Sequence, residues 1–148
     1  ELGADIPVCL EEKPCVMRGI GEKLTFIQLD KKLPCILINP KIELSTPEVF
    51  KTFKQDKYKF SKHVEFSNDI IKTLSISHND LQKPAIELCP EIEKTIRLLE
   101  EQEGCHLARM SGSGASCFGV FGSIEQAKKA YYQLSENKDL WIKYGFIK

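Results

Sequence analysis

The chain has 148 residues, 42% of them hydrophobic and 28% charged, and its 21 basic residues balance its 21 acidic residues. This length and composition are typical of one globular domain with a sizeable core. A zero net charge argues against nucleic acid as the main partner. No apolar run approaches the roughly 20 residues that span a bilayer, so we expect no membrane-embedded segment.

The first residue is Glu1, with neither an initiator methionine nor a signal-peptide pattern around it. We expect from this that a further part of the protein lies upstream. The six cysteines form no C-x-x-C pair, and the three histidines, His63, His78 and His106, are scattered singly. Reduced thiols in a cytoplasmic protein are therefore the favoured interpretation, and no metal site is predicted.

The first predicted elements, in chain order, are two short strands at 13–18 and 23–29. Glycines on both sides of the short link between them favour a hairpin. The continuous apolar run at 33–39 predicts a buried strand. A helix is predicted to begin at Thr46, whose hydroxyl can accept a hydrogen bond from the first turn, with Pro47 tolerated there.

The second half of the chain alternates between helical and strand patterns. A loop is predicted at 54–64, followed by helices at 67–74, at 79–88, from Pro90 to Gly104 and from Ser123, and by strands at 105–110, 115–121 and 140–147. From residue 33 the order is strand, helices, strand, strand, helix, strand. This order predicts an α+β fold with helices covering one face of an antiparallel sheet, close to the split βαβ (ferredoxin-like) arrangement.

Asp5 is the strongest candidate for catalysis. It follows the small-residue turn Gly3-Ala4, and the apolar neighbours Leu2 and Ile6 suggest a partly buried segment. A carboxylate held in this way could accept a proton from a substrate hydroxyl if a cation elsewhere keeps it ionised. A turn or helix-cap role is the alternative for an aspartate in this setting.

The second candidate is the segment Met110 to Ser116, MSGSGAS, which lies between two apolar runs. Closely spaced glycines expose backbone N–H groups and allow positive φ, which suits close approach to phosphate oxygens. The segment is not a Walker loop, and a plain hairpin turn is the alternative. Phe50 is a third candidate, because with Thr46 and Pro47 it could form an apolar wall for a planar base, although core packing is the alternative.

Five segments in one order carry a family resemblance: LGADIP at 2–7, RGIGEKL at 18–24, STPEVF at 45–50, NDLQKPAIELCPEI at 79–92 and MSGSGASCFGVF at 110–121. Together they resemble the C-terminal half of the 4-diphosphocytidyl-2-C-methyl-D-erythritol kinases of the GHMP superfamily. The resemblance implies that residues 1–30 are the last piece of an N-terminal ATP-binding domain. Residues 31–148 would then be the GHMP C-terminal substrate-binding domain.

The resemblance also implies roles. Asp5 falls at the position of the family's catalytic aspartate, which accepts the proton of the substrate's 2-hydroxyl as that hydroxyl attacks ATP. Thr46, Pro47 and Phe50 fall in the segment that borders the cytidine of the substrate. The three loop residues Gly112, Ser113 and Gly114 match a motif that supports the phosphate-binding loop.

The family implies ATP and Mg2+, neither held by this chain alone, and a cytidine diphosphate-linked alcohol as substrate. The expected location is the bacterial cytoplasm or a plastid-type compartment. The family's phosphate-binding loop and substrate lysine belong to the upstream half, so the chain by itself is expected to be inactive. Three alternatives stay open: another GHMP kinase of the mevalonate or homoserine type, a non-catalytic α+β binding module, and an inert fragment.

Overall fold

The computed structural model describes residues 11, 13–19, 22–29, 31–54, 58–62, 64–67 and 69–147. These residues belong to two compact units, one ending at Lys32 and the other running from Leu33 to Ile147. Each unit contains a sheet of its own, with two strands in the first and four in the second.

The first unit is built on the predicted hairpin. Strand β1 (Cys15–Arg18) pairs antiparallel with β2 (Lys23–Phe26), and Ile27 N–H donates to the Pro14 carbonyl at 2.9 Å beyond the strand ends. Gly19 has a φ of +69° in the tight link, a conformation that glycine adopts easily because it has no Cβ. The hairpin is thus confirmed, although β2 ends three residues earlier than predicted.

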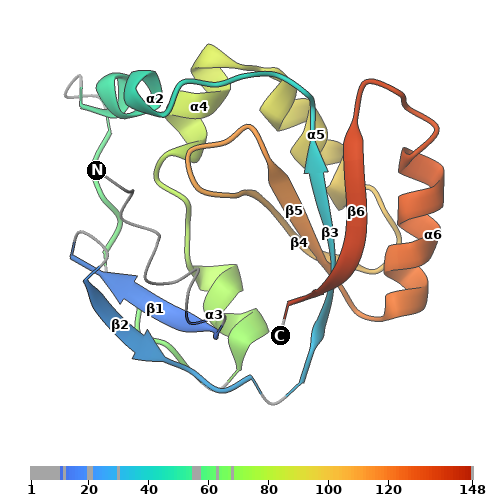
Figure 1. Cartoon of the computed structure of the whole chain (residues 1–148), viewed down its shortest axis with the longest axis horizontal. Helices are drawn as coiled ribbons and strands as arrows, with labels where there is room; N and C mark the ends of the chain where they lie inside the picture. The colour runs from blue at the N-terminus through green and yellow to red at the C-terminus, as the bar shows by residue number, and fades with distance from the viewer. Residues whose placement is uncertain are drawn as a thin grey trace. The chain divides into compact units, whose positions relative to one another are not determined.

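The second unit has a four-stranded antiparallel sheet in the order β4-β5-β3-β6 (Figure 1). Its strands are β3 (Leu33–Asn39), β4 (Cys105–Met110), β5 (Cys117–Phe121) and β6 (Trp141–Ile147). Strands β3 and β4 run parallel to each other with the antiparallel β5 between them. This is the predicted split βαβ arrangement, and it is confirmed.

Helices α5 (Glu91–Glu100) and α6 (Ile124–Leu134) cover one face of this sheet. The strand register places Ile36, Ile38 and Ile142 on the covered face, and all three are buried. Their spacing of two residues matches the strand period. The remaining helices are α2 (Thr46–Phe53), α3 (Ile70–Ile76) and α4 (Gln82–Leu88).

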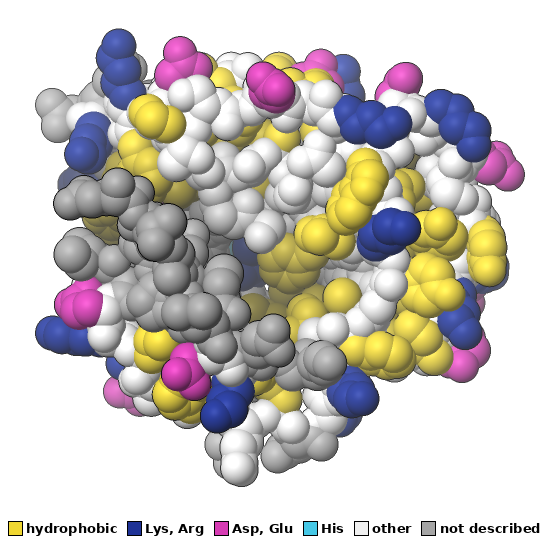
Figure 2. Space-filling model, viewed as in Figure 1, with side chains coloured by type: hydrophobic (Ala, Val, Ile, Leu, Met, Phe, Trp, Pro, Cys, Tyr) yellow, Lys and Arg dark blue, Asp and Glu magenta, His cyan; other side chains and the backbone are white. Residues whose placement is uncertain are grey.

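The opposite face of the sheet is more open. Leu37 and Trp141 project from it and are partly exposed. Arg109 of β4 lies on the same face and donates to the Leu74 carbonyl at 2.7 Å and to Ser77 Oγ at 3.0 Å. These bonds fasten α3 to the side of the sheet opposite α5 and α6. Figure 2 shows hydrophobic side chains at the surface over β6 and α6, where Tyr144 and Tyr132 are exposed.

Two predicted helices begin later than expected. Helix α3 begins at Ile70, because the Asp69 carboxylate accepts from Lys72 N–H at 3.0 Å and caps the first turn. Helix α4 begins at Gln82 rather than 79, because Asn79 and Asp80 are used in hydrogen bonds to other segments. Within the described residues, no helix has both the length and the apolar character needed to cross a membrane.

The helix-covered face predicts a large stability difference between two leucines. Leu99 on α5 is fully buried, whereas Leu88 at the end of α4 is 44% exposed. Leu99→Ala should lower the free energy of unfolding by about 2–5 kcal/mol, and Leu88→Ala by about 0.5 kcal/mol or less. Urea unfolding followed by circular dichroism measures both, and equal losses would contradict the assigned core.

Candidate functional site

The loop from Ser111 to Ser116 joins β4 to β5 and is closed by backbone hydrogen bonds. Ser111 N–H donates to the Ser116 carbonyl at 2.8 Å, and Gly114 N–H donates to the Ser111 carbonyl at 3.0 Å. Gly112 and Gly114 have φ values of +57° and +94°. Two of the predicted glycine positions therefore need a conformation that residues with a Cβ rarely adopt.

The outer part of this loop is open to a ligand. A Cβ placed on Gly112 would meet no atom within 4 Å. Within the described part of the chain, the N–H groups of Gly112 and Ser113 have no hydrogen-bond acceptor. Two adjacent free N–H groups above an open space suit an anion such as a phosphate oxygen.

Asn79 anchors the loop from the start of α4. Its Nδ2 donates to the Met110 carbonyl at 2.9 Å and to the Gly112 carbonyl at 2.8 Å, while its Oδ1 accepts from Leu81 N–H at 3.0 Å. Gln82 adds a bond, because its Oε1 accepts from Met110 N–H at 3.1 Å. The sequence predicted only the start of a helix at Asn79, and no local pattern there indicates a contact with a loop 31 positions away.

Two further side chains hold the loop from other elements. Thr46 Oγ1 and Ser113 Oγ are hydrogen-bonded at 2.7 Å, and Asn39 Nδ2 donates to Ser116 Oγ at 2.9 Å. The prediction that Thr46 caps its own helix is wrong: Ser45 occupies the cap position, and Thr46 is the first helical residue. Its hydroxyl instead brings the start of α2 to the loop, so Thr46 and Ser113 are brought together.

Pro47 lies in the first turn of α2, as predicted, and Glu48 places a negative charge at the positive end of the helix. Val49 and Phe53 are buried on the core side, while Phe50 is 38% exposed. A partly exposed ring one turn from Thr46 is available to contact a ligand near the loop. Asp5 lies outside the described residues.

A polar pocket of about 680 Å³ lies beside the loop. Its lining is Tyr58, Lys59, Ser61, His78, Asn79, Asp80, Gln82, Lys83 and Arg109. The Arg109 guanidinium is half-buried, and burial lowers its pKa from the usual range. Asn79 belongs both to this pocket, called the Arg109 pocket below, and to the support of the glycine loop.

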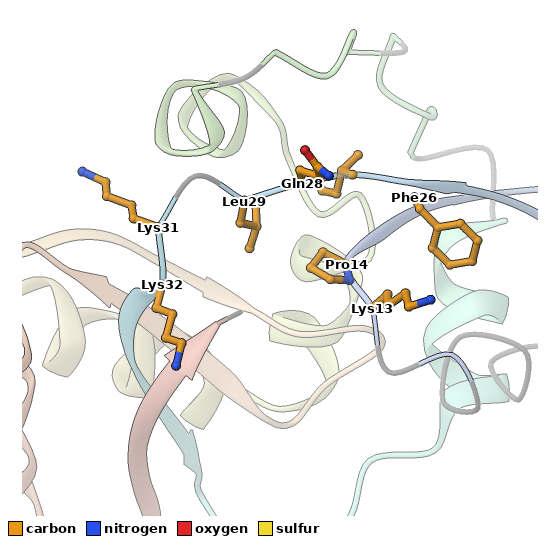
Figure 3. Close-up of a pocket in the computed structure, with 8 residues that line it drawn as sticks. Lys13, Pro14, Phe26, Gln28, Leu29, Lys31 and Lys32 are labelled. Atoms are coloured by element: carbon orange, nitrogen blue, oxygen red, sulfur yellow. The ribbon is translucent and has the colours of Figure 1, made fainter.

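The first unit contains a different pocket, of about 870 Å³, lined by the two residues before β1, by Phe26 at the end of β2 and by the segment that follows β2. Figure 3 shows Lys13 beside the Phe26 ring, with its Nζ 5.7 Å from the ring centroid, while Lys31 and Lys32 extend in other directions. None of the predicted site residues that the structure describes lines this pocket.

The buried Cys117 thiol of β5 is not a candidate nucleophile. Burial, with a smaller contribution from the nearby Cys89 thiol, raises the pKa of Cys117 to about 12, so this thiol stays protonated at neutral pH. Among the described residues, no three His, Cys, Asp or Glu side chains gather closely enough to hold a metal ion.

Comparison with known proteins agrees with this geometry. The family described as GHMP kinases C terminal matches residues 63–139. The chain is 44% identical over 146 residues to 4-diphosphocytidyl-2-C-methyl-D-erythritol kinase of Wolbachia sp. subsp. Brugia malayi (strain TRS), covering 95% of this chain and 50% of that protein.

Two solved structures share the fold. A crystal structure of 4-(cytidine 5'-diphospho)-2C-methyl-D-erythritol kinase matches with a TM-score of 0.77 and 26% identity, over 96% of this chain and 53% of that one. Homoserine kinase from Cytophaga hutchinsonii matches with a TM-score of 0.60 and 14% identity, over 90% and 47% of the two chains. The second likeness shows the fold alone.

The chain belongs to the GHMP kinase family, with its C-terminal domain in the second unit. The resemblance drawn from five sequence segments is thereby confirmed, and the curated relatives that share it are named as 4-diphosphocytidyl-2-C-methyl-D-erythritol kinases. The chain spans about half the length of the curated relatives it matches.

The loop geometry predicts unequal effects at its two positive-φ glycines. An added Cβ at Gly114 would lie 2.9 Å from Met110 Sδ and 3.1 Å from Leu44 Cδ2, in addition to the φ strain. Gly114→Ala should therefore cost about 2–5 kcal/mol of stability, and Gly112→Ala, with open space, about 1–2 kcal/mol. Urea unfolding of the two variants tests this, and an equal cost would show that packing around Gly114 is unimportant.

Proposed function

We propose that the protein carrying this chain transfers the γ-phosphoryl group of ATP to the 2-hydroxyl of 4-diphosphocytidyl-2-C-methyl-D-erythritol. The observation that carries this proposal is the glycine loop with two free N–H groups, held against the start of α2, in a chain 44% identical to a relative of that name. The likeness to homoserine kinase is one of fold and favours no second substrate.

In this proposal the described residues bind and position the substrates. The N–H groups of Gly112 and Ser113, which have no acceptor among the described residues, donate to phosphate oxygens, and Gly114 keeps the loop in shape. Thr46, Pro47 and Phe50 border the cytidine, with the Phe50 ring against the base. Such positioning supplies much of the catalysis of phosphoryl transfer.

ATP is the phosphoryl donor, and Asp5 handles the proton. The substrate hydroxyl oxygen forms a bond to the γ-phosphorus as the bond to the bridging oxygen breaks, which releases ADP. Asp5 accepts the hydroxyl proton or holds it in a hydrogen bond. The described residues form no cluster that fits Mg2+ by itself, so no step is assigned to that ion through this chain.

The proposal extends to the domains and the setting. Residues 1–30 would complete an ATP-binding domain, residues 31–148 would form the substrate-binding domain, and an upstream half would supply the rest of the site. The chain spans about half of its relatives' length, which supports a site shared between this chain and an upstream half. A cytoplasmic or plastid-type location follows from the same assignment.

The proposal is tested in a chimera in which this chain replaces the matching part of the Brugia malayi Wolbachia relative. ADP release is measured with 4-diphosphocytidyl-2-C-methyl-D-erythritol, homoserine or mevalonate as acceptor. We expect turnover with the cytidine-bearing alcohol alone. A folded chimera that turns over none of them would favour a non-catalytic binding module, and one that prefers homoserine or mevalonate would favour another GHMP kinase.

Asp5→Asn in the chimera should lower kcat by about 10²–10⁴-fold or more, because an amide cannot accept the hydroxyl proton. The matched control is Asp139→Asn, an exposed aspartate near the end of the second unit. Steady-state kinetics measure both variants. Near-normal turnover in Asp5→Asn would remove this residue from the mechanism.

Phe50→Ala should raise KM for the cytidine substrate several-fold with a smaller change in kcat, because ring stacking acts equally in the ground and transition states. Tyr132→Ala, which removes a 64% exposed ring from α6, is the control and should leave both constants unchanged. Loss of kcat with an unaltered KM would contradict the base-stacking role.

A further inference from the structure

The Arg109 pocket has a charge arrangement that the proposed reaction does not use. Arg109, Lys59 and Lys83 line it, and Asp80 is the acidic side chain among its described lining residues. Within the described part of the chain, none of the three cations forms an ion pair. The pocket therefore carries a surplus of positive charge in a protein whose overall net charge is zero.

Asp80 offsets one of these three positive charges, and hydrogen bonds from Ser61 hold its carboxylate in place. One oxygen accepts from Ser61 N–H at 2.9 Å, and the other accepts from Ser61 Oγ. These bonds tie the segment that bears Lys59 to the start of α4, which bears Lys83. The carboxylate thus holds two walls of the pocket together.

Arg109 forms a fixed part of the pocket wall. Two of its N–H groups donate to the Leu74 carbonyl and to Ser77 Oγ, which orients the guanidinium plane. A guanidinium has five N–H groups, so three remain without an acceptor among the described residues. Every buried side-chain nitrogen and oxygen of the described residues has a hydrogen-bond partner, so Arg109 Nε, which has no acceptor there, is accessible to solvent. The Arg109 side chain lines the pocket.

This combination of groups matches one ligand chemistry. A planar guanidinium fork and two flexible ammonium groups bind the tetrahedral oxygens of phosphate through charge-assisted hydrogen bonds. The side chains of Asn79 and Gln82 also line the pocket, but both already form hydrogen bonds to the Met110–Gly112 segment. We therefore assign the ligand contacts to the three cations.

We propose that the Arg109 pocket binds the phosphate group of a small molecule, with Arg109 as the oriented donor and Lys59 and Lys83 as the flexible cations. The pocket would bind phosphate through its own residues whether or not the kinase reaction takes place. The phosphate could belong to a nucleotide engaged at the neighbouring glycine loop or to a separate phosphorylated compound.

Binding is measured by NMR titration of the 148-residue chain and of the chimera with sodium phosphate, against sodium chloride at the same ionic strength. We expect saturable shifts of the Arg109 Nε–H and of the backbone around Lys83 with phosphate only. No saturable shift, or the same shift with chloride, would overturn the proposal. A shift in the chain that is lost in the chimera would also overturn it, because the pocket would then be filled in the longer protein.

Two variants test the assignment of residues. Lys83→Gln removes one exposed charge and should weaken phosphate binding about fivefold. Lys128→Gln on α6, also an exposed helical lysine, is the matched control and should have no effect. Arg109→Lys keeps the charge but loses the fork, and we expect about tenfold weaker binding in protein whose amide spectrum remains native. Equal binding by Lys83→Gln and the control would contradict the proposal.

A second set of titrations, with cytidine diphosphate, distinguishes the two sources of the phosphate group. If the nucleotide supplies it, cytidine diphosphate displaces inorganic phosphate, and Phe50→Ala weakens cytidine diphosphate but not phosphate. If a separate compound supplies it, both bind together without competition. Either result supports phosphate binding in the Arg109 pocket. If the pocket does not bind phosphate, this proposal fails, but the kinase assay of the chimera still tests the proposed function separately.

Discussion

The Asn79 carboxamide is the interaction on which the arrangement of the site depends. A buried or half-buried carbonyl without a hydrogen-bond partner is costly. The Asn79 side-chain NH2 group donates hydrogen bonds to the carbonyls of Met110 and Gly112. Its Oδ1 accepts a hydrogen bond from Leu81 N–H, which holds the side chain in place. The loop is thereby set against the start of α4, while the N–H groups of Gly112 and Ser113 have no acceptor among the described residues.

The two faces of the four-stranded sheet have different roles: one packs into the core, and the other carries a residue of the Arg109 pocket. Ile36, Ile38 and Ile142 pack against α5 and α6 on one face, where burial of apolar surface supplies most of the stabilisation. The opposite face presents Arg109, which is too polar for such a core and is held by α3. Because side chains alternate along β4, Met110 points into the core while Arg109, its neighbour, points to the pocket.

Charge in this protein is organised locally rather than globally. The whole chain is neutral, so its overall charge gives no sign of the basic pocket beside the loop. Lys59, Lys83 and Arg109 are separated by up to 50 positions in the chain and belong to three different segments. No window along the sequence contains the three of them, so composition could not reveal their grouping.

By itself the sequence determined the elements, the split βαβ order and the family, because these depend on local apolar periodicity, on glycines and on short contiguous motifs. The beginning of α2 near Thr46 and the run of β3 at 33–39 needed nothing further. Only the tertiary structure decided that Thr46 bonds to Ser113 rather than capping its helix, and that Asn79 and Arg109 flank one loop. Those contacts join residues 30 or more positions apart, and the hydrogen-bond partner of a polar side chain depends on what the fold brings near it.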